Sequence, residues 1–423
     1  MKAPWLARSL WLLGFACLWL NVADDPPLRS EAYVLDVDAE SVTIGLITSA
    51  PSRVSVECFD RSGASVGGVL AGEAARRHAM RVPKLLPGVE YEYRVAVDGE
   101  VAYRGSVRTA PVDDRAPVRF AFLGDSGDQP WWVWLQRTPV LHWPARWGWF
   151  PDSAAVTGLG AAVAGYGPDF VVHLGDVVYP KGQHAHYRSG FFRPFSAALA
   201  QAPFWAVLGN HDVMEAGGQQ VLANLRVPNP DAVAGGRHFS RAFGPVRILG
   251  LDCNSDYSGV HVDARHSALE FVRHQVQHCS EPWIVVAAHF PMRSASRQKD
   301  RGELLVALLP ELQANAVSIY MSGHDHCYQR FLDAAAPDVP LVSSGGGGKD
   351  LYDVRPHKHA KVLVKAFHWG SIEVRGTSLE VRCHGLDGAQ LDEFRVPLPA
   401  GPRLEDLHSR NPARAARIAK LGG

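Results

Sequence analysis

Hydrophobic residues in the second two-thirds of the chain are gathered into five short runs that contain almost no polar positions. The runs begin at Arg119, Phe170, Phe204, Trp283 and Ala316, and each is five or six residues long and rich in Val, Ala, Ile and aromatic side chains. Runs of this kind are typical of strands that are buried on both faces, as in the sheets of α/β proteins. We therefore expect an α/β domain that extends over about residues 118–398.

The N-terminal third shows a different pattern, in which polar and apolar residues alternate along short segments. These segments begin at Ser41, Arg53, Tyr91 and Ala102, and Gly-containing turns separate them. Strands with a period of two at this spacing predict a small antiparallel β-sandwich, which we place at residues 30–110. Residues 111–117 are then a linker to the α/β domain, and residues 402–423 a C-terminal tail that we expect to be a frayed helix or disordered.

Side chains able to bind a metal ion follow each of the five buried runs. The candidate ligands are Asp125, Asp176, Tyr179, Asn210, His289, His324 and His326. Because open α/β sheets place their sites at the carboxyl ends of the strands, we expect these side chains to converge. Seven oxygen and nitrogen ligands are too many for one tetrahedral ion and suit two ions that share a carboxylate. A two-metal centre is typical of enzymes that hydrolyse phosphate esters.

Each motif is a weak signal when it stands alone. Gly-Asp and Gly-Asn pairs are ordinary turn residues, and a buried Tyr179 is usually a core residue with a hydrogen-bonded hydroxyl. The signal comes from their order, since all five motifs follow a buried strand. The interpretation that all five motifs are only turn or core residues is therefore weaker than the interpretation that they bind metal.

The ordered motifs resemble those of the calcineurin-like metallophosphoesterases, and Tyr179 narrows the resemblance to the purple acid phosphatases. The resemblance covers about residues 118–396. It implies an α/β sandwich of two central sheets flanked by helices, and it suggests that the N-terminal sandwich is fibronectin type III-like. It also implies an acid phosphatase, which is a metal-dependent phosphoric monoester hydrolase.

The same resemblance implies how the ligands are divided between two ions. Asp125, Tyr179 and His326 would hold a ferric iron, Asn210, His289 and His324 would hold a divalent iron, zinc or manganese, and Asp176 would bridge both. The chemistry agrees, because a phenol with a pKa near 10 ligates as phenolate only beside a strongly Lewis-acidic ion. The ion pair would lower the pKa of bound water, and the resulting hydroxide would attack phosphorus in line.

His211, which follows the candidate ligand Asn210, is the candidate general acid for the leaving group. The alternative is that His211 only orients a ligand. Further histidines often follow the motif of His289 in the family, whereas this chain has Arg293, Arg297 and Lys299 there. Arg293 is either a phosphate clamp or a solvated surface residue. This departure keeps two alternatives open, a phosphodiesterase on the same metal scaffold and a non-catalytic binding protein that retains the fold.

Composition and the N-terminus narrow the partners and the location. The 43 basic residues balance the 43 acidic residues, so nothing favours a nucleic-acid or membrane-surface partner, and we expect a small phosphoester substrate. Lys2 and Arg8 precede an apolar stretch, which predicts a signal peptide over residues 1–23 or an uncleaved anchor, and export to the periplasm or medium. A bridge between Cys253 and Cys279 stays open, and the sequence does not indicate an oligomeric state.

Two further segments have more than one interpretation. The Trp-rich insert at residues 131–149 is either a lid or aromatic wall over the site, or a satellite core that folds over the sandwich. The four glycines at residues 345–348 predict a tight turn at a strand end near the site rather than a phosphate cradle, because no helix clearly follows them.

Overall fold

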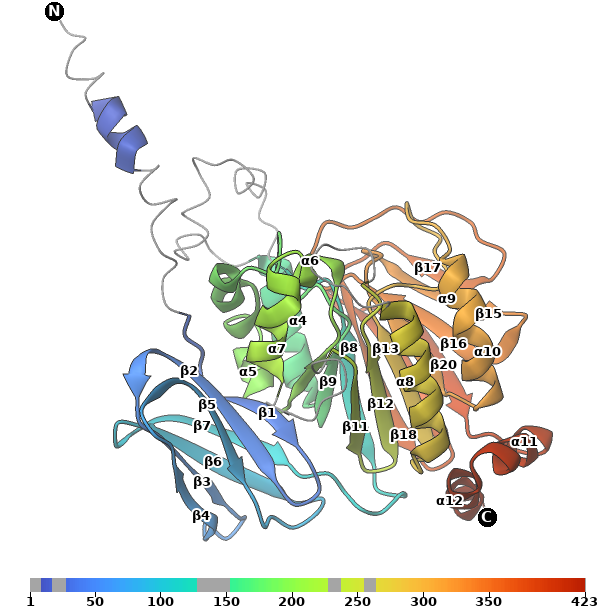
Figure 1. Cartoon of the computed structure of the whole chain (residues 1–423), viewed down its shortest axis with the longest axis horizontal. Coiled ribbons are helices and arrows are strands. Elements are labelled where there is room, and N and C mark those ends of the chain that lie inside the picture. Colours follow the sequence, from blue (N-terminus) through green and yellow to red (C-terminus); the bar gives the residue numbers. More distant parts are fainter. Residues whose placement is uncertain (1–8, 17–27, 128–152, 227–236, 255–263, 423) are drawn as a thin grey trace, which may run out of the picture.

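The structure is a computed structural model that describes residues 9–16, 28–127, 153–226, 237–254 and 264–422. The Trp-rich insert at residues 131–149 and most of the expected signal peptide lie outside these ranges. Two bodies are visible in Figure 1, a β-sandwich followed by a larger α/β domain. This arrangement confirms the expected fold class.

The N-terminal sandwich consists of a three-stranded and a four-stranded antiparallel sheet. The first contains β1 (Tyr33–Val37), β2 (Val42–Ser52) and β5 (Ala75–Val82), in that order. The second has the order β4 (Ser65–Ala71), β3 (Val54–Phe59), β6 (Glu90–Val97) and β7 (Glu100–Arg108). Alternate residues of β3 and β6 are buried between the sheets, as the period-two pattern predicted.

Two larger sheets form the centre of the α/β domain. The six-stranded sheet has the order β10 (Phe204–Ala206), β9 (Phe170–His173), β8 (Val118–Leu123), β18 (His368–Arg375), β19 (Ser378–Gly385) and β20 (Gln390–Pro397). The seven-stranded sheet has the order β11 (Phe239–Phe243), β12 (Val246–Leu251), β13 (Trp283–Ala288), β14 (Ile319–Ser322), β16 (Ala336–Ser344), β15 (Tyr328–Asp333) and β17 (Ala360–Val364).

The apolar runs are continuous because their strands are covered on both faces. All residues of β9 and β13 are buried. One set of side chains of the core strands, including Phe120 of β8, Phe170 of β9 and Val285 of β13, packs between the two sheets. The opposite set of side chains packs under helices. The six-stranded sheet is covered by α4 (Ala154–Tyr166), α5 (Ser196–Leu199) and α7 (Gln219–Leu225). The seven-stranded sheet is covered by α8 (Ala264–His278), α9 (Gly302–Ala307) and α10 (Leu309–Ala314).

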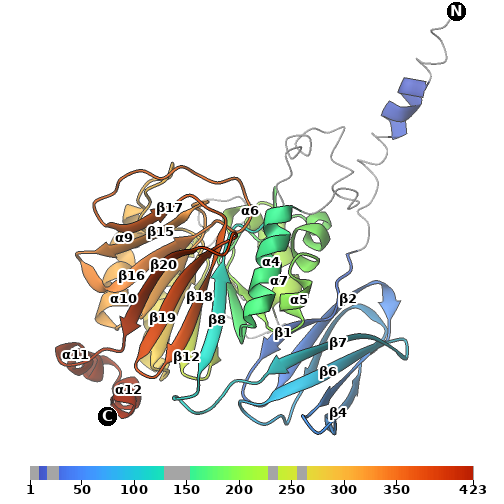
Figure 2. The same ribbon diagram turned by 180° about the vertical axis from the view of Figure 1, so that it is seen from behind.

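The C-terminal tail is ordered, so the prediction of a frayed helix or a disordered segment is wrong. It forms α11 (Pro402–Arg410) and α12 (Pro412–Gly422), which lie at the opposite end of the domain from α6 (Asn210–Val213) in both views (Figures 1 and 2). Leu407 and Ile418 belong to the core. The apolar stripe of a short helix is therefore what fixes the tail to the domain.

A buried arginine holds this tail in place. The guanidinium of Arg414 is fully buried and donates hydrogen bonds of 2.6–3.1 Å to the carbonyls of Glu281, Pro282, Asn315 and Ala316. Burial lowers the pKa of Arg414 to about 10, which leaves it charged at neutral pH. One cation thus satisfies carbonyls from two chain segments that precede β13 and β14.

No helix in the described part of the chain is long and apolar enough to cross a membrane. The five cysteines in the described ranges, which include Cys253 and Cys279, are buried and form no disulfide with one another.

Replacing Arg414 with methionine should destabilise the protein. The substitution leaves four buried carbonyls without their donor, and we expect a loss of about 3 kcal/mol in the free energy of unfolding. Chemical denaturation followed by circular dichroism measures this loss. The control is Arg410→Met on the exposed surface of α11, which should stay within about 0.5 kcal/mol of the parent. Equal stability of both variants would show that the tail contributes little to the fold.

Candidate metal centre

The seven predicted ligands lie together at the carboxyl ends of the core strands. Asp125 follows β8, Asp176 and Tyr179 follow β9, Asn210 opens α6 after β10, His289 follows β13, and His324 and His326 follow β14. Six of the seven side chains are buried, and His324 is partly exposed. The two sheets thus bring into one cluster residues that are separated by up to 201 positions in sequence. Within it, Asp125, Asp176 and His289 offer ligand atoms that all lie within 4.8 Å of one another.

One half of the cluster surrounds the hydroxyl of Tyr179. This oxygen is 3.0 Å from Oδ1 of Asp125, 3.0 Å from Oδ2 of Asp176 and 3.3 Å from Nε2 of His326. Nε2 of His326 is also 3.3 Å from Oδ1 of Asp125. Ligand atoms at right angles around an ion about 2.1 Å away are themselves about 3 Å apart, so these spacings fit one coordination sphere.

The other half surrounds the side-chain oxygen of Asn210. This oxygen is 2.9 Å from Nδ1 of His324 and 3.0 Å from Nε2 of His289. Oδ1 of Asp176 is 3.5 Å from Nε2 of His289, whereas Oδ2 of the same carboxylate faces Tyr179. Asp176 therefore directs one oxygen toward each half, which is the arrangement of a bridging ligand.

Backbone carbonyls fix which nitrogen of two imidazoles faces the cluster. Nδ1 of His289 lies 2.8 Å from the carbonyl of Leu174, and Nδ1 of His326 lies 2.7 Å from that of Asp350. A carbonyl only accepts hydrogen bonds, so in the neutral ring the proton is on Nδ1 and Nε2 carries a lone pair. Each lone pair then points at oxygens of the cluster. For His289 the nearest of these oxygens is the side-chain carbonyl of Asn210 at 3.0 Å, a contact between two acceptors that a bound cation would turn into shared coordination, so the donor set fits metal ions.

The electrostatics of the cluster agree with that reading. Burial, together with the neighbouring Asp125 and Asp176, raises the pKa of the Tyr179 phenol well above its ordinary value of 10.0. Burial lowers the pKa of His324 well below its ordinary value of 6.5, and the nearby His289 adds to this effect. His324 is therefore neutral and able to ligate. Tyr179 ionises only if a strongly Lewis-acidic cation compensates its surroundings.

The backbone at three ligands is left-handed. The φ angles of Asp125, Asp176 and His324 are 58°, 54° and 67°. Such conformations cost non-glycine residues about 1–3 kcal/mol each and are concentrated at functional sites. Neighbouring glycines make the close packing possible, because a Cβ on Gly209 would lie 2.1 Å from Oδ1 of Asp176.

A buried carboxylate that is not a ligand holds two of the metal-binding loops together. Asp212 accepts hydrogen bonds from the backbone N–H groups of Asp176 (2.7 Å), Val177 (2.9 Å) and Gly209 (2.8 Å). Burial and the adjacent Asp176 raise its pKa well above the ordinary value of 3.8. Asp212 comes directly after His211 in the sequence, and its side chain contacts backbone N–H groups, as a turn residue does. Its role in joining the two loops was missed, because no short motif connects positions 176 and 212.

His211 lies at the edge of the cluster and is partly exposed. Its backbone N–H donates to Oδ1 of Asp176 at 2.8 Å, and Nδ1 of its ring lies 2.5 Å from the carbonyl of Pro180. The ring centroid is 4.5 Å from that of Tyr179. The Pro180 carbonyl holds the proton on Nδ1, so Nε2 is the ring atom left for a substrate.

The three cationic residues after His289 have different environments. Arg293 pairs at 2.5 Å with both Asp300 and Asp333, so the hypothesis that it clamps a phosphate is wrong. Arg297 and Lys299 are exposed. The sequence could not reveal the pairing of Arg293 with Asp333, since Arg293 lies in a loop and Asp333 follows forty positions later at the end of β15.

The glycine-rich segment forms the tight turn that was predicted near the site. It follows β16, and Gly347 donates its N–H to the carbonyl of Gly124 at 3.0 Å. Lys349 donates its own backbone N–H to the carbonyl of Asp125 at 3.1 Å. A Cβ on Gly345 would lie 2.8 Å from Oδ2 of Asp125, so this position requires glycine for close approach.

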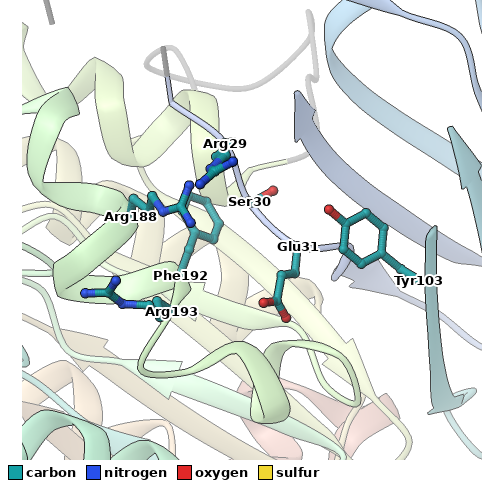
Figure 3. Close-up of a pocket in the computed structure, with 7 residues that line it drawn as sticks. All are labelled: Arg29, Ser30, Glu31, Tyr103, Arg188, Phe192 and Arg193. Atoms are coloured by element: carbon teal, nitrogen blue, oxygen red, sulfur yellow. The ribbon is translucent and has the colours of Figure 1, made fainter. Parts of the chain in front are cut away.

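A separate hollow of about 250 Å³ lies where the sandwich meets the α/β domain. It is lined by Arg29, Ser30, Glu31, Tyr103, Arg188, Phe192 and Arg193. Figure 3 shows Arg29 and Arg188 on one side of this hollow and Tyr103 of β7 on the other. None of the seven predicted ligands lines it, so it is distinct from the candidate metal centre.

Comparisons with known proteins agree with this geometry. Residues 118–328 match the family model of the calcineurin-like phosphoesterases. Purple acid phosphatase 4 of Arabidopsis thaliana is 28% identical over 250 residues, which cover 53% of this chain and 73% of that protein. Tartrate-resistant acid phosphatase type 5 of Sus scrofa is 25% identical over 351 residues, which cover 75% of this chain and 96% of that protein.

The fold has a solved counterpart in purple acid phosphatase PPD1 from seeds of yellow lupin (Lupinus luteus). The two structures superpose with a TM-score of 0.71 at 15% sequence identity, over 92% of this chain and 77% of the lupin chain. At this identity the likeness establishes the shared fold, sandwich and α/β domain together.

Replacing Asp212 with asparagine should weaken metal binding. An amide has only one acceptor oxygen, so at least one of the three N–H groups would face a donor, and the loops that carry Asp176 and Asn210 would move apart. We expect metal affinity to fall about tenfold or more, which equilibrium dialysis with elemental analysis measures. Glu215→Gln, an exposed substitution at the end of the same turn, is the control. Full metal retention in both variants would contradict the positioning role.

Proposed function

Residues 118–328 of this chain form a calcineurin-like phosphoesterase domain with purple acid phosphatase relatives, and on this basis we propose an acid phosphatase that acts on phosphate monoesters. The chain is thus a phosphoester hydrolase by family. The observation that carries the more specific proposal is the convergence of seven donor atoms around two positions, with Asp176 directed toward both.

The ligand sets assign each ion a different chemistry. Asp125, Tyr179 and His326 suit a ferric iron, because a carboxylate and a phenolate offer it two negative charges. Asn210, His289 and His324 carry no charge of their own and suit a divalent iron, zinc or manganese. When bound, such a pair supplies an activated water and neutralises charge on the phosphoryl group.

The protein's own residues orient the substrate and handle the leaving group. His211 is held by its backbone contact to Asp176 and by the Pro180 carbonyl, so its Nε2 has a fixed position beside Tyr179. A leaving alkoxide bound there would take a proton from this nitrogen when the ring is protonated on both nitrogens. Gly209, Gly323 and Gly345 pack directly against the ligand loops, because a Cβ at these positions would lie 2.1 Å from Oδ1 of Asp176, 2.6 Å from Oδ2 of Asp125 and 2.4 Å from the carbonyl oxygen of Asp325.

The natural location that we propose is outside the cytoplasm, as the N-terminal apolar stretch after Arg8 suggests. The fibronectin type III-like character of the N-terminal sandwich is likewise a proposal. The packing of a three-stranded sheet against a four-stranded sheet supports this proposal.

Comparing p-nitrophenyl phosphate with bis(p-nitrophenyl) phosphate tests the substrate class. We expect kcat/KM for the monoester to exceed that for the diester at least tenfold, because the monoester presents its full charge to both ions. Release of p-nitrophenol at mildly acid pH measures both reactions. Faster turnover of the diester would instead identify a phosphodiesterase, and a metal-loaded protein inert toward both would favour a binding protein that retains the fold.

Replacing His211 with alanine should lower kcat by about 10²–10⁴-fold, because the leaving group loses its proton donor. Metal content should stay unchanged, as the ligand atoms are untouched. Turnover of p-nitrophenyl phosphate, together with elemental analysis, separates the two roles considered for this residue. Loss of metal would show that the His211 ring only helps to orient the ligands. His278→Ala on the exposed face of α8 is the control.

A further inference from the structure

An aromatic ring separates a candidate metal ligand from an exposed cation. The rings of His326 and Tyr352 stack with centroids 4.0 Å apart and an interplanar angle of 26°. The guanidinium carbon of Arg297 lies 3.6 Å from the centroid of the same Tyr352 ring. Two groups this close to one ring cannot share a face. Arg297 and His326 therefore lie on opposite faces of Tyr352.

Polar atoms connect the same three residues along the edge of the ring. The hydroxyl of Tyr352 is 3.4 Å from Nε2 of His326, the nitrogen that faces the metal centre. The same hydroxyl accepts a hydrogen bond from Nη2 of Arg297. Arg297 is thus only two polar contacts away from the candidate ligand His326. Stacking and the hydrogen bond together fix the orientation of its guanidinium.

The two loops that carry this stack form one lip beside the metal centre. The N–H of Arg355 donates to the carbonyl of Ala295 at 2.7 Å, which joins residues 293–301 to residues 349–358. The N–H of Tyr352 donates to the carbonyl of His326 at 2.9 Å, which joins the lip to the ligand loop. The lip is therefore part of the same rigid framework as the cluster.

The net charge of this lip is positive. Each acidic residue in the two loops already has a cationic partner, since Asp300 pairs with Arg293, Asp350 with Lys349 and Asp353 with Lys365. The exposed cations on the two loops are Arg297, Lys299, Arg355 and Lys358. Within the described residues, Arg297 has a phenol as its partner and makes no ion pair.

We propose that Arg297, held on Tyr352, is a second anion subsite that binds a phosphate group on the leaving group of the substrate. This inference rests on the proposed phosphatase activity and specifies its substrate class, phosphorylated compounds whose leaving group carries a second phosphate. A guanidinium binds phosphate oxygens with paired hydrogen bonds, and its fixed orientation reduces the entropy lost on binding.

Hydrolysis of a nucleoside diphosphate illustrates the chemistry. The oxygen of water bonds to the terminal phosphorus and loses a proton, the bond from that phosphorus to the bridging oxygen breaks, and the bridging oxygen keeps the electron pair and becomes a terminal oxygen of the nucleoside monophosphate. The products are inorganic phosphate and a nucleoside monophosphate, and no oxidant or reductant is needed. While the terminal phosphate reacts at the metal centre, the remaining phosphate of the leaving group would contact Arg297.

The test compares ADP with AMP in the parent enzyme and in Arg297→Gln. The leaving group of ADP carries a phosphate, whereas that of AMP is the uncharged nucleoside. We expect the substitution to lower kcat/KM for ADP about tenfold, mainly through a higher KM, and to change kcat/KM for AMP by less than twofold. Tyr352→Leu removes the platform of Arg297 together with the ring that covers His326, so it should lower kcat/KM for both nucleotides, with the larger loss for ADP. Arg61→Gln on the exposed surface of the sandwich is the matched control.

Calorimetric titration of the metal-loaded protein with pyrophosphate and with orthophosphate gives a readout that does not depend on turnover. Arg297→Gln should weaken pyrophosphate binding about tenfold and leave orthophosphate binding within twofold. Equal losses for ADP and AMP, or for both anions, would overturn the second subsite and place Arg297 at the reacting phosphate. No change for any ligand would also overturn it. A protein that fails to hydrolyse either nucleotide yet shows the selective pyrophosphate effect would refute the proposed activity while retaining the subsite.

Discussion

Mutual repulsion among buried electron-rich atoms is the constraint on which the rest of this structure depends. Two carboxylates, a phenol, an amide oxygen and three imidazoles face one another at 2.9–3.5 Å. Carbonyls of Leu174 and Asp350 hold the protons of two imidazoles on the far nitrogen, so lone pairs point inward. The Tyr179 hydroxyl can donate to only one of these neighbours at a time, so cations bound among the remaining acceptors would stabilise the cluster.

The core strands and the loops between them hold the ligands in place against this repulsion. Strands buried on both faces end within three residues of Asp176 and His289, and the carboxylate of Asp212 joins the loop of Asp176 to the turn at Gly209. The left-handed backbone at Asp125, Asp176 and His324 persists because these neighbours determine it. At the other end of the domain, Arg414 fixes the C-terminal helices to the segments that precede β13 and β14.

The elements that could be predicted from the sequence are those whose signal is local. Continuous apolar runs identified the strands that end at Asp125, Asp176 and His289, and the turn residues after them identified the cluster. Contacts between distant segments could not be predicted. Asp212 looked like an ordinary turn residue, and Arg293 resembled a phosphate clamp until its partners on other segments were known.

The C-terminal tail differs from its prediction for a related reason. Its charged residues indicated a solvated segment, yet Arg414 is buried because backbone carbonyls replace its water. Tyr352 gave no signal in the sequence, although its ring covers His326. In each case a polar or aromatic side chain gained its role from backbone groups and rings that the topology supplies.

Metal analysis of the purified protein, combined with its visible absorption spectrum, tests the central claim most directly. The account predicts two metal ions per chain, at least one of them iron, with a tyrosinate-to-iron charge-transfer band that disappears in Tyr179→Phe. A single ion per chain, or an active protein that contains only zinc or manganese and is colourless, would contradict it.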